Sequence, residues 1–212
     1  MILVVGGYGW KGIEVAEKIK HLNLKRYDKI ITNGLPGFFM ACNYLNKKEL
    51  SKEVVKSLKP YLNTVDKDYP LFGNIKNCFK LNSSFGDYNY EFELDIKLDF
   101  NLEIEIINLK SKKIETKRID TLKGAFYYST LLPGIRPPSN DWYNTSSFSR
   151  APCYSLLKYK DEEIEIYADS LKYNKSSTIQ RLYKSIQVMR SRYFYKICID
   201  KVSSQNKVKL LS

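Results

Sequence analysis

Two short apolar segments near the start of the chain, each followed by glycines and then by a helical pattern, constrain its fold most. Residues 1–5 are apolar and lead into the glycine-rich stretch 6–12. Apolar residues three and four positions apart then predict a helix over 13–20. The apolar run 29–32 leads through a second glycine-bearing turn into an apolar helix over 38–45. Because a strand, helix, strand, helix order is typical of parallel strands, we expect an α/β protein.

The middle of the chain carries a clean alternation of apolar and polar residues. It runs from Tyr90 to Ile106 and predicts a strand with one buried face, which bends near 99–101 because it is too long for one ordinary strand. Residues 110–113 then turn into a partner strand over 114–119. Acidic residues occupy the polar face, and we interpret them as a solvated strand face rather than as catalytic carboxylates: Glu91, Glu93, Asp95, Glu103 and Glu105.

Weaker patterns predict the remaining elements. An amphipathic helix is expected over 47–62, an irregular segment over 63–88 and a helix over 121–132. A strand over 164–167 leads to Asp169. A helix over 177–189 and a final strand over 193–199 complete the predicted order. We find no internal repeat and no linker, and therefore expect a single domain over 1–212.

Composition indicates an ordinary globular protein. Of 212 residues, 43% are hydrophobic and 27% charged. No apolar run is long enough to span a bilayer, and the N-terminal apolar segment is too short for a signal peptide. The four cysteines are widely separated and lack metal-ligand spacing. We therefore expect a cytoplasmic protein, peripheral to membranes at most, with no metal and no cofactor.

The formal net charge of +12 is the first functional signal to weigh. Strong positive charge suits nucleic acid or anionic lipid as a partner. Here the excess is carried mainly by scattered lysines, without a basic stripe interleaved with aromatic residues, so we do not expect nucleic acid. An anionic membrane surface stays open as a partner.

The glycine-bearing turn after the second predicted strand has the pattern of a known catalytic turn. Gly34-Leu35-Pro36-Gly37 stands between a strand and a helix, where the G-x-S-x-G elbow of hydrolases presents a serine hydroxyl at its apex. Here the apex residue is Leu35, and a leucine cannot attack a carbonyl carbon. The framework of a nucleophile is therefore present without the reactive atom.

The N-terminal glycines allow two interpretations. Gly7, Gly9 and Gly12 match the G-x-G-x-x-G pattern of dinucleotide-binding proteins, but the expected acid at the end of the second strand is replaced by Thr32-Asn33. Alternatively, the glycines free backbone N–H groups to bind an oxyanion, with Lys11 adding a positive charge.

Four segments in order connect these observations to a family. A glycine loop with a basic residue (7–12), the elbow, the segment Tyr128–Gly134 followed by Pro137-Pro138, and Asp169 with Asn174 after it are spaced over most of the chain. In this the chain resembles the patatin-like phospholipases, lipid acyl hydrolases with a serine–aspartate dyad. The resemblance implies a three-layer fold, with a central mostly parallel sheet flanked by helices and an added β-hairpin region near 88–120.

The chain departs from the family at its catalytic positions, so the resemblance implies a pseudoenzyme. Leu35 replaces the serine, Pro36 follows it without an N–H, and Ser170-Leu171 replace the glycines after the aspartate. We expect no intact catalytic residue. Leu35 and Asp169 mark the vestigial dyad, Gly34 and Gly37 the elbow, and the oxyanion-loop remnant comprises Gly7, Gly9, Lys11 and Gly12.

The expected role is binding rather than turnover. The candidate partners are a lipid or anionic membrane surface, or a protein partner or larger assembly. Two alternatives remain: an active phospholipase or esterase with an unrecognised nucleophile, for which Thr32 and Cys42 are nearest to the apex, and a Rossmann-like nucleotide-binding domain.

Overall fold

The computed structural model describes residues 1–7, 9–66, 95–131, 141–147, 151–169 and 207–211, and for 60–66, 169 and 207–211 it describes the backbone path. Predictions that fall on 67–94, 132–140 and 170–206 lie outside these residues. They include most of the irregular segment after the third helix, the Pro137-Pro138 segment, the helix over 177–189 and the strand over 193–199.

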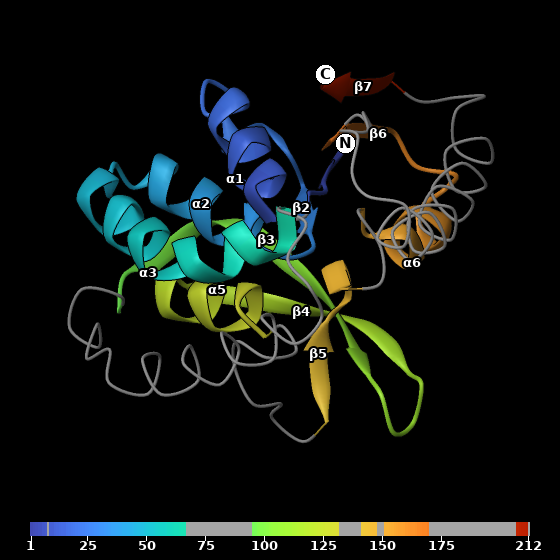
Figure 1. Cartoon of the computed structure of the whole chain (residues 1–212). Coiled ribbons are helices and arrows are strands. Elements are labelled where there is room, and N and C mark those ends of the chain that lie inside the picture. The colour runs from blue at the N-terminus through green and yellow to red at the C-terminus, as the bar shows by residue number, and fades with distance from the viewer. Residues whose placement is uncertain (8, 67–94, 132–140, 148–150, 170–206, 212) are drawn as a thin grey trace.

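One mixed sheet forms the centre of the described structure (Figure 1). Its main strands lie in the order β4-β3-β2-β1-β6-β7. All neighbouring pairs are parallel except β3–β4 and β3–β5. The strands are β1 (Ile2–Val5), β2 (Lys29–Thr32), β3 (Lys97–Asn108), β4 (Ile114–Thr121), β5 (Trp142–Asn144), β6 (Ile164–Asp169) and β7 (Lys207–Leu211). The predicted α/β fold with a mostly parallel sheet is confirmed.

Helices cover both faces of the sheet. One face packs against α1 (Gly9–Lys18), α2 (Pro36–Tyr44), α3 (Lys48–Asp66) and α5 (Leu122–Ser129), and the other against α6 (Cys153–Lys158). Two short 3₁₀ turns, Leu24–Arg26 and Thr145–Ser147, connect the elements.

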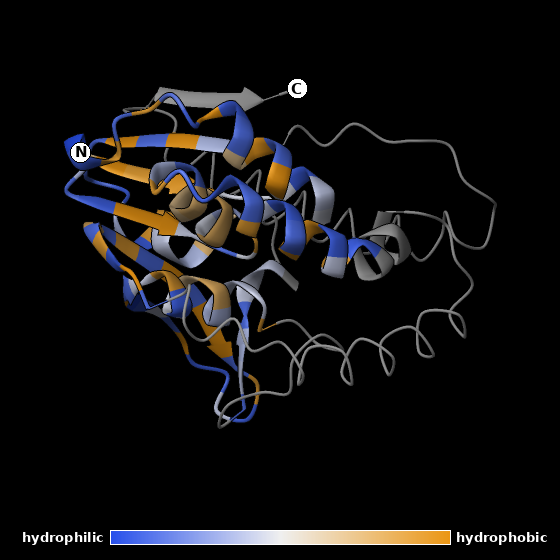
Figure 2. Ribbon diagram, turned by 90° about the vertical axis from the view of Figure 1, so that its left-hand side faces the viewer, coloured by the Kyte–Doolittle hydropathy of each residue, from blue (hydrophilic) through white to orange (hydrophobic). Residues whose placement is uncertain are grey.

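The apolar residues divide between two cores. The larger core is built on Leu3, Val5 and Ile30 of the sheet together with the apolar residues of α2. The smaller one joins Val4 and Ile166 to Leu156 of α6. Figure 2 shows hydrophobic residues gathered in the strands and on the helices that cover them.

From Lys97 onward the long alternating segment forms the predicted strand and hairpin, whereas residues 95 and 96 lie before the strand and 90–94 lie outside the described residues. Phe100, Leu102, Ile104 and Ile106 are buried, and β3 pairs antiparallel with β4. The pairing register shifts between Lys97 and Leu102, where the sequence predicted a bend. The prediction of a solvated polar face is wrong in part, because Glu105 is only 2% exposed. Asp95 is exposed, whereas Glu103 is half-buried.

Several element boundaries differ from the prediction. The glycine loop predicted over 6–12 is shorter, because α1 already begins at Gly9. This helix ends at Lys18 rather than at residue 20. Helix α3 extends to Asp66, and α5 ends at Ser129 rather than 132. Strands β5 and β7 and helix α6 were not predicted; β5 and α6 are too short to show a period. No helix within the described ranges is both long and apolar enough to cross a membrane.

Candidate functional site at the carboxyl ends of the strands

The parallel sheet brings the predicted site segments to one edge. Val5 of β1 pairs with Thr32 of β2 on one side and with Tyr167 of β6 on the other. The carboxyl ends of these strands therefore lie side by side. The glycines after β1, the elbow after β2 and Asp169 at the end of β6 share that edge of the sheet. Such an edge is where open α/β sheets usually bind ligands.

The elbow is a tight turn between a strand and a helix, as predicted. Strand β2 ends at Thr32 and α2 begins at Pro36, which takes the first helical position and needs no donor there. Gly34 has a φ of +71°, and a Cβ at this position would lie 2.7 Å from the Ser146 hydroxyl oxygen. Only glycine fits both requirements.

Leu35 does not occupy an exposed apex. Its backbone is right-handed helical, with φ −60° and ψ −31°, and its side chain is 2% exposed within the larger core. A catalytic elbow holds its nucleophile in a strained conformation with the hydroxyl exposed. At Leu35 the turn is unstrained and the side chain serves as a core residue.

The glycine stretch packs directly against the elbow. A Cβ on Gly7 would lie 2.5 Å from the Cα of Gly12, and a Cβ on Gly12 would lie 3.0 Å from both the Gly7 carbonyl oxygen and Pro36 Cδ. The first turns of α1 and α2 therefore touch, which accounts for two of the glycines without any ligand. Gly9, Lys11 and Gly12, predicted in an oxyanion loop, instead lie in α1.

The Gly7 carbonyl oxygen is poorly placed for an oxyanion at the elbow. Near the position of a Gly34 Cβ, Gly7 presents its carbonyl oxygen, at 3.4 Å, which is a hydrogen-bond acceptor. An oxyanion needs donors. Lys11 is half exposed and forms an ion pair of 2.7 Å with Glu14.

Asn144 holds the elbow in place, and sequence reasoning missed it. Its Oδ1 accepts hydrogen bonds from the Gly34 N–H at 2.7 Å and the Ser146 N–H at 2.9 Å. Its Nδ2 donates to the carbonyl oxygen of Tyr128 at 2.9 Å. Strand β5 can supply this residue because it pairs with β3 just beyond the end of β2. The side chain is fully buried.

The segment Tyr128-Ser129 lies against the elbow as well. The Phe38 N–H in the first turn of α2 donates to the Ser129 hydroxyl at 3.1 Å. Leu35 cannot cap α2, since it has no side-chain acceptor, and Ser129 of α5 fulfils that function from another element. The structure thus brings the glycine stretch, the elbow and this segment into contact. The end of β6, at Asp169, lies at the same edge of the sheet.

A buried carboxylate lies on the α6 face of the sheet. Glu105 of β3 accepts hydrogen bonds from the Thr145 hydroxyl at 3.0 Å, the Ser155 hydroxyl at 2.7 Å and the Ser155 N–H at 2.8 Å. The capping residue of α6 is Pro152, which makes no side-chain cap. Glu105 therefore satisfies the first turn of α6. The alternating pattern could not distinguish it from its exposed neighbours, because β5 and α6 were not predicted.

Burial raises the pKa of Glu105 above its ordinary value of 4.5, although the Ser155 and Thr145 donors oppose this shift. The native state therefore binds the proton more tightly than the unfolded state. The contribution of Glu105 to stability is greatest below pH 4.5 and falls as the pH rises through the folded-state pKa.

Glu105→Gln should remove this pH dependence while keeping the shape of the side chain. Its amide can accept from Ser155 and donate to Thr145. As the pH rises above 4.5, we expect the free energy of unfolding of the original protein to fall relative to that of the variant. Urea unfolding of both proteins across this range measures the difference. If the free energies of unfolding of the two proteins depend on pH in the same way, Glu105 is not the source of the pH dependence.

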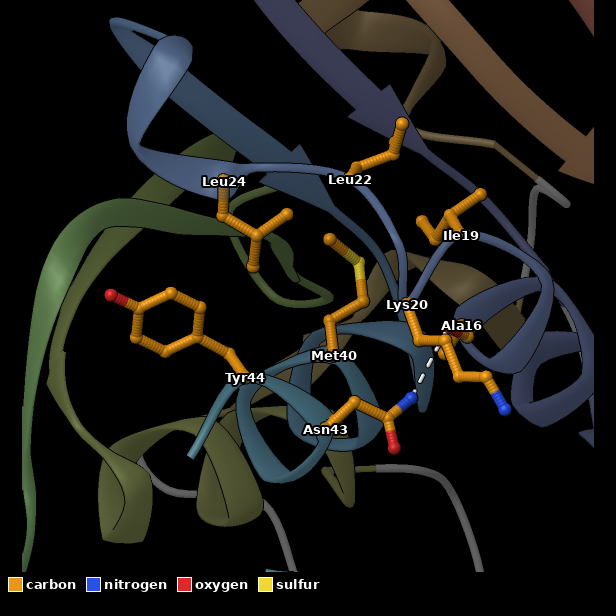
Figure 3. Close-up of a pocket in the computed structure, with 8 residues that line it drawn as sticks. All are labelled: Ala16, Ile19, Lys20, Leu22, Leu24, Met40, Asn43 and Tyr44. Atoms are coloured by element: carbon orange, nitrogen blue, oxygen red, sulfur yellow. Dashed lines mark hydrogen bonds between the residues drawn. The ribbon is translucent and has the colours of Figure 1, made fainter. Parts of the chain in front are cut away.

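A pocket at the opposite edge of the sheet is too small for a substrate (Figure 3). It lies between the ends of α1 and α2 and is lined by residues that include Lys20, Met40 and Tyr44. Its volume of about 20 Å³ suits a single water molecule. Asn43 closes one side by donating to the Ala16 carbonyl oxygen at 3.3 Å.

Comparison with known proteins does not assign the chain to a family. No model of a known protein family matches it, and no curated protein matches it. Within the described part of the chain, no group of three potential metal ligands comes together.

Proposed function

We propose that this chain is a catalytically inactive protein of the patatin-like phospholipase kind, which binds a lipid or a protein partner instead of hydrolysing an ester. The resemblance in sequence is supported by the convergence of its motifs on one edge of a mostly parallel sheet. The glycine stretch, the elbow and Ser129 are in direct contact there, and β6 delivers Asp169 to the same edge.

The burial of Leu35 is the observation that carries the proposal. A residue at the serine position that is 2% exposed, in an unstrained helical conformation, contributes to the core and itself offers no nucleophile. The Gly7 carbonyl oxygen near Gly34 also disfavours an anion at this place. Both features support a protein that has lost ester hydrolysis but has kept the elbow and the glycine stretch.

The alternative nucleophiles nearest to Leu35 along the sequence are poorly suited to replace the serine. Cys42 is fully buried in α2, and burial raises the pKa of its thiol to about 12, so the reactive thiolate is scarce at neutral pH. Thr32 is fully buried at the end of β2, where its hydroxyl packs closely against Gly37. Neither side chain can meet a substrate without opening the core.

Covalent labelling tests this proposal. A fluorophosphonate reacts with activated serines, and we expect the purified protein to show no more labelling than the same protein after heat denaturation. An active serine hydrolase run beside it serves as the positive control. Stoichiometric labelling that is lost on denaturation would reveal a nucleophile and overturn the proposal.

A further inference from the structure

The β3–β4 hairpin extends beyond the body of the sheet, with β5 along one side (Figure 1). Its turn, residues 109–113, is exposed throughout, and we call it the hairpin tip. Leu109 is 44% exposed, which makes it the most exposed of the large hydrophobic side chains within the described residues. A single exposed leucine is common on protein surfaces, so its meaning depends on the residues around it.

The hairpin tip is held in a defined shape. Asn108 Oδ1 accepts from both the N–H and the hydroxyl of Ser111, at 2.8 and 3.0 Å. The Asn108 N–H donates to the Lys113 carbonyl oxygen at 2.8 Å, and the Leu109 N–H to that of Asp141 at 3.1 Å. A surface that is already ordered loses little conformational entropy on binding.

Positive charge follows the exposed leucine along the hairpin tip. Lys110, Lys112 and Lys113 follow it within four positions, and Lys113 pairs with Glu115 at 3.0 Å. Lys110 and Lys112 form no ion pair with any described residue. Residues 107–121 contain five basic and two acidic residues, a net charge of +3. Asp141 is the additional carboxylate beside the tip.

Lys112 keeps its charge in an unfavourable backbone conformation. Its φ is +58°, in the left-handed region where glycine or asparagine is usual and other side chains cost energy. Replacement of Lys112 by glycine therefore removes a charge without a penalty to the turn.

We propose that the hairpin tip docks the protein onto anionic lipid membranes. The lysine ammonium groups face lipid phosphates and carboxylates, each strengthening binding about fivefold, while Leu109 enters the boundary between headgroups and acyl chains. Trp142 and Tyr143 stand half-buried beside the tip, and such aromatic residues favour membrane interfaces. An exposed leucine next to these lysines favours lipid over nucleic acid. The inference rests on the proposed function for the expectation that lipid is bound and left intact.

Sedimentation with vesicles tests the inference. The full-length protein is mixed with phosphatidylcholine vesicles, with or without phosphatidylserine. We expect binding only with phosphatidylserine, and a loss on the order of 100-fold in Lys110→Gln/Lys112→Gly/Lys113→Gln. A matched variant removes the same charge from exposed positions of α3, Lys52→Gln/Lys56→Gln/Lys59→Gln, and should bind within about threefold of the original. Leu109→Ser should weaken binding about fivefold, even at high salt.

Three outcomes would overturn the inference: equal losses in both triple variants, equal binding to the two kinds of vesicle, or tip-dependent binding to duplex DNA without binding to vesicles. Thin-layer chromatography of the sedimented lipid separates this test from that of the proposed function. Lipid that is hydrolysed would overturn catalytic inactivity while leaving the docking surface supported.

Discussion

Leu35→Ser will destabilise the protein by about 3 kcal/mol and will not create an esterase. The substitution leaves a cavity in the larger core and buries a hydroxyl where Leu35 is 2% exposed. Because the backbone at this position is helical and unstrained, the new hydroxyl would face the core rather than a substrate. Urea unfolding measures the first effect, and hydrolysis of a nitrophenyl ester measures the second.

Leu35→Met is the matched control for this substitution. It preserves the volume and apolar character of the side chain and should cost less than about 1.5 kcal/mol. If Leu35→Ser instead unfolds at the same urea concentration as the original protein, the side chain is not a core residue. Ester hydrolysis by this variant that disappears on adding Asp169→Ala would show that the rest of a catalytic site is intact.

Asn144→Ala should be comparably damaging, with a loss of about 3 kcal/mol, although it lies outside every sequence motif. The substitution deprives the Gly34 and Ser146 N–H groups and the Tyr128 carbonyl oxygen of their partner in a fully buried place. The substitution removes the link from Gly34 to β5 and to the Tyr128 carbonyl oxygen, and leaves the Ser129–Phe38 hydrogen bond as a remaining link to α5. Urea unfolding monitored by circular dichroism measures the change in stability.

An asparagine on the surface provides the comparison for Asn144. Asn23 Oδ1 accepts one hydrogen bond, from the Lys25 N–H at 3.2 Å, in an exposed turn. Asn23→Ala should therefore cost less than about 1 kcal/mol, since water replaces the lost partner. Equal effects of the two substitutions would mean that Asn144 does not organise the elbow.

Local patterns were sufficient to predict strands β1, β2, β3, β4 and β6, but not β5 and β7 or the contacts that complete the sheet. The alternation through Ile106 and the apolar run before Gly34 predicted their strands because period and turn chemistry are local properties. The prediction that Glu105 is solvated was wrong because its burial depends on α6, a short helix that is far away in the sequence. Asn144 was missed for the same reason, because a strand of three residues has no readable period.

The candidate site divides in the same way. The family resemblance implied that the glycine stretch and the elbow belong to one site, and in the structure they meet at Gly12 and Pro36. The early start of α1 at Gly9 was not foreseen, since glycine favours turns over helices in isolation. Leu35 was identified as the wrong residue for catalysis from its chemistry alone. Its place in the core depends on packing that no local pattern records.

Turnover of lipid and ester substrates by the purified protein tests the central claim most directly. The measurement compares the release of fatty acid from phospholipid vesicles, and of nitrophenol from a short-chain ester, by the original protein and by Asp169→Ala. Catalytic inactivity predicts that both proteins give the rate of buffer alone. Turnover by the original protein that Asp169→Ala abolishes would contradict it and identify a working hydrolase.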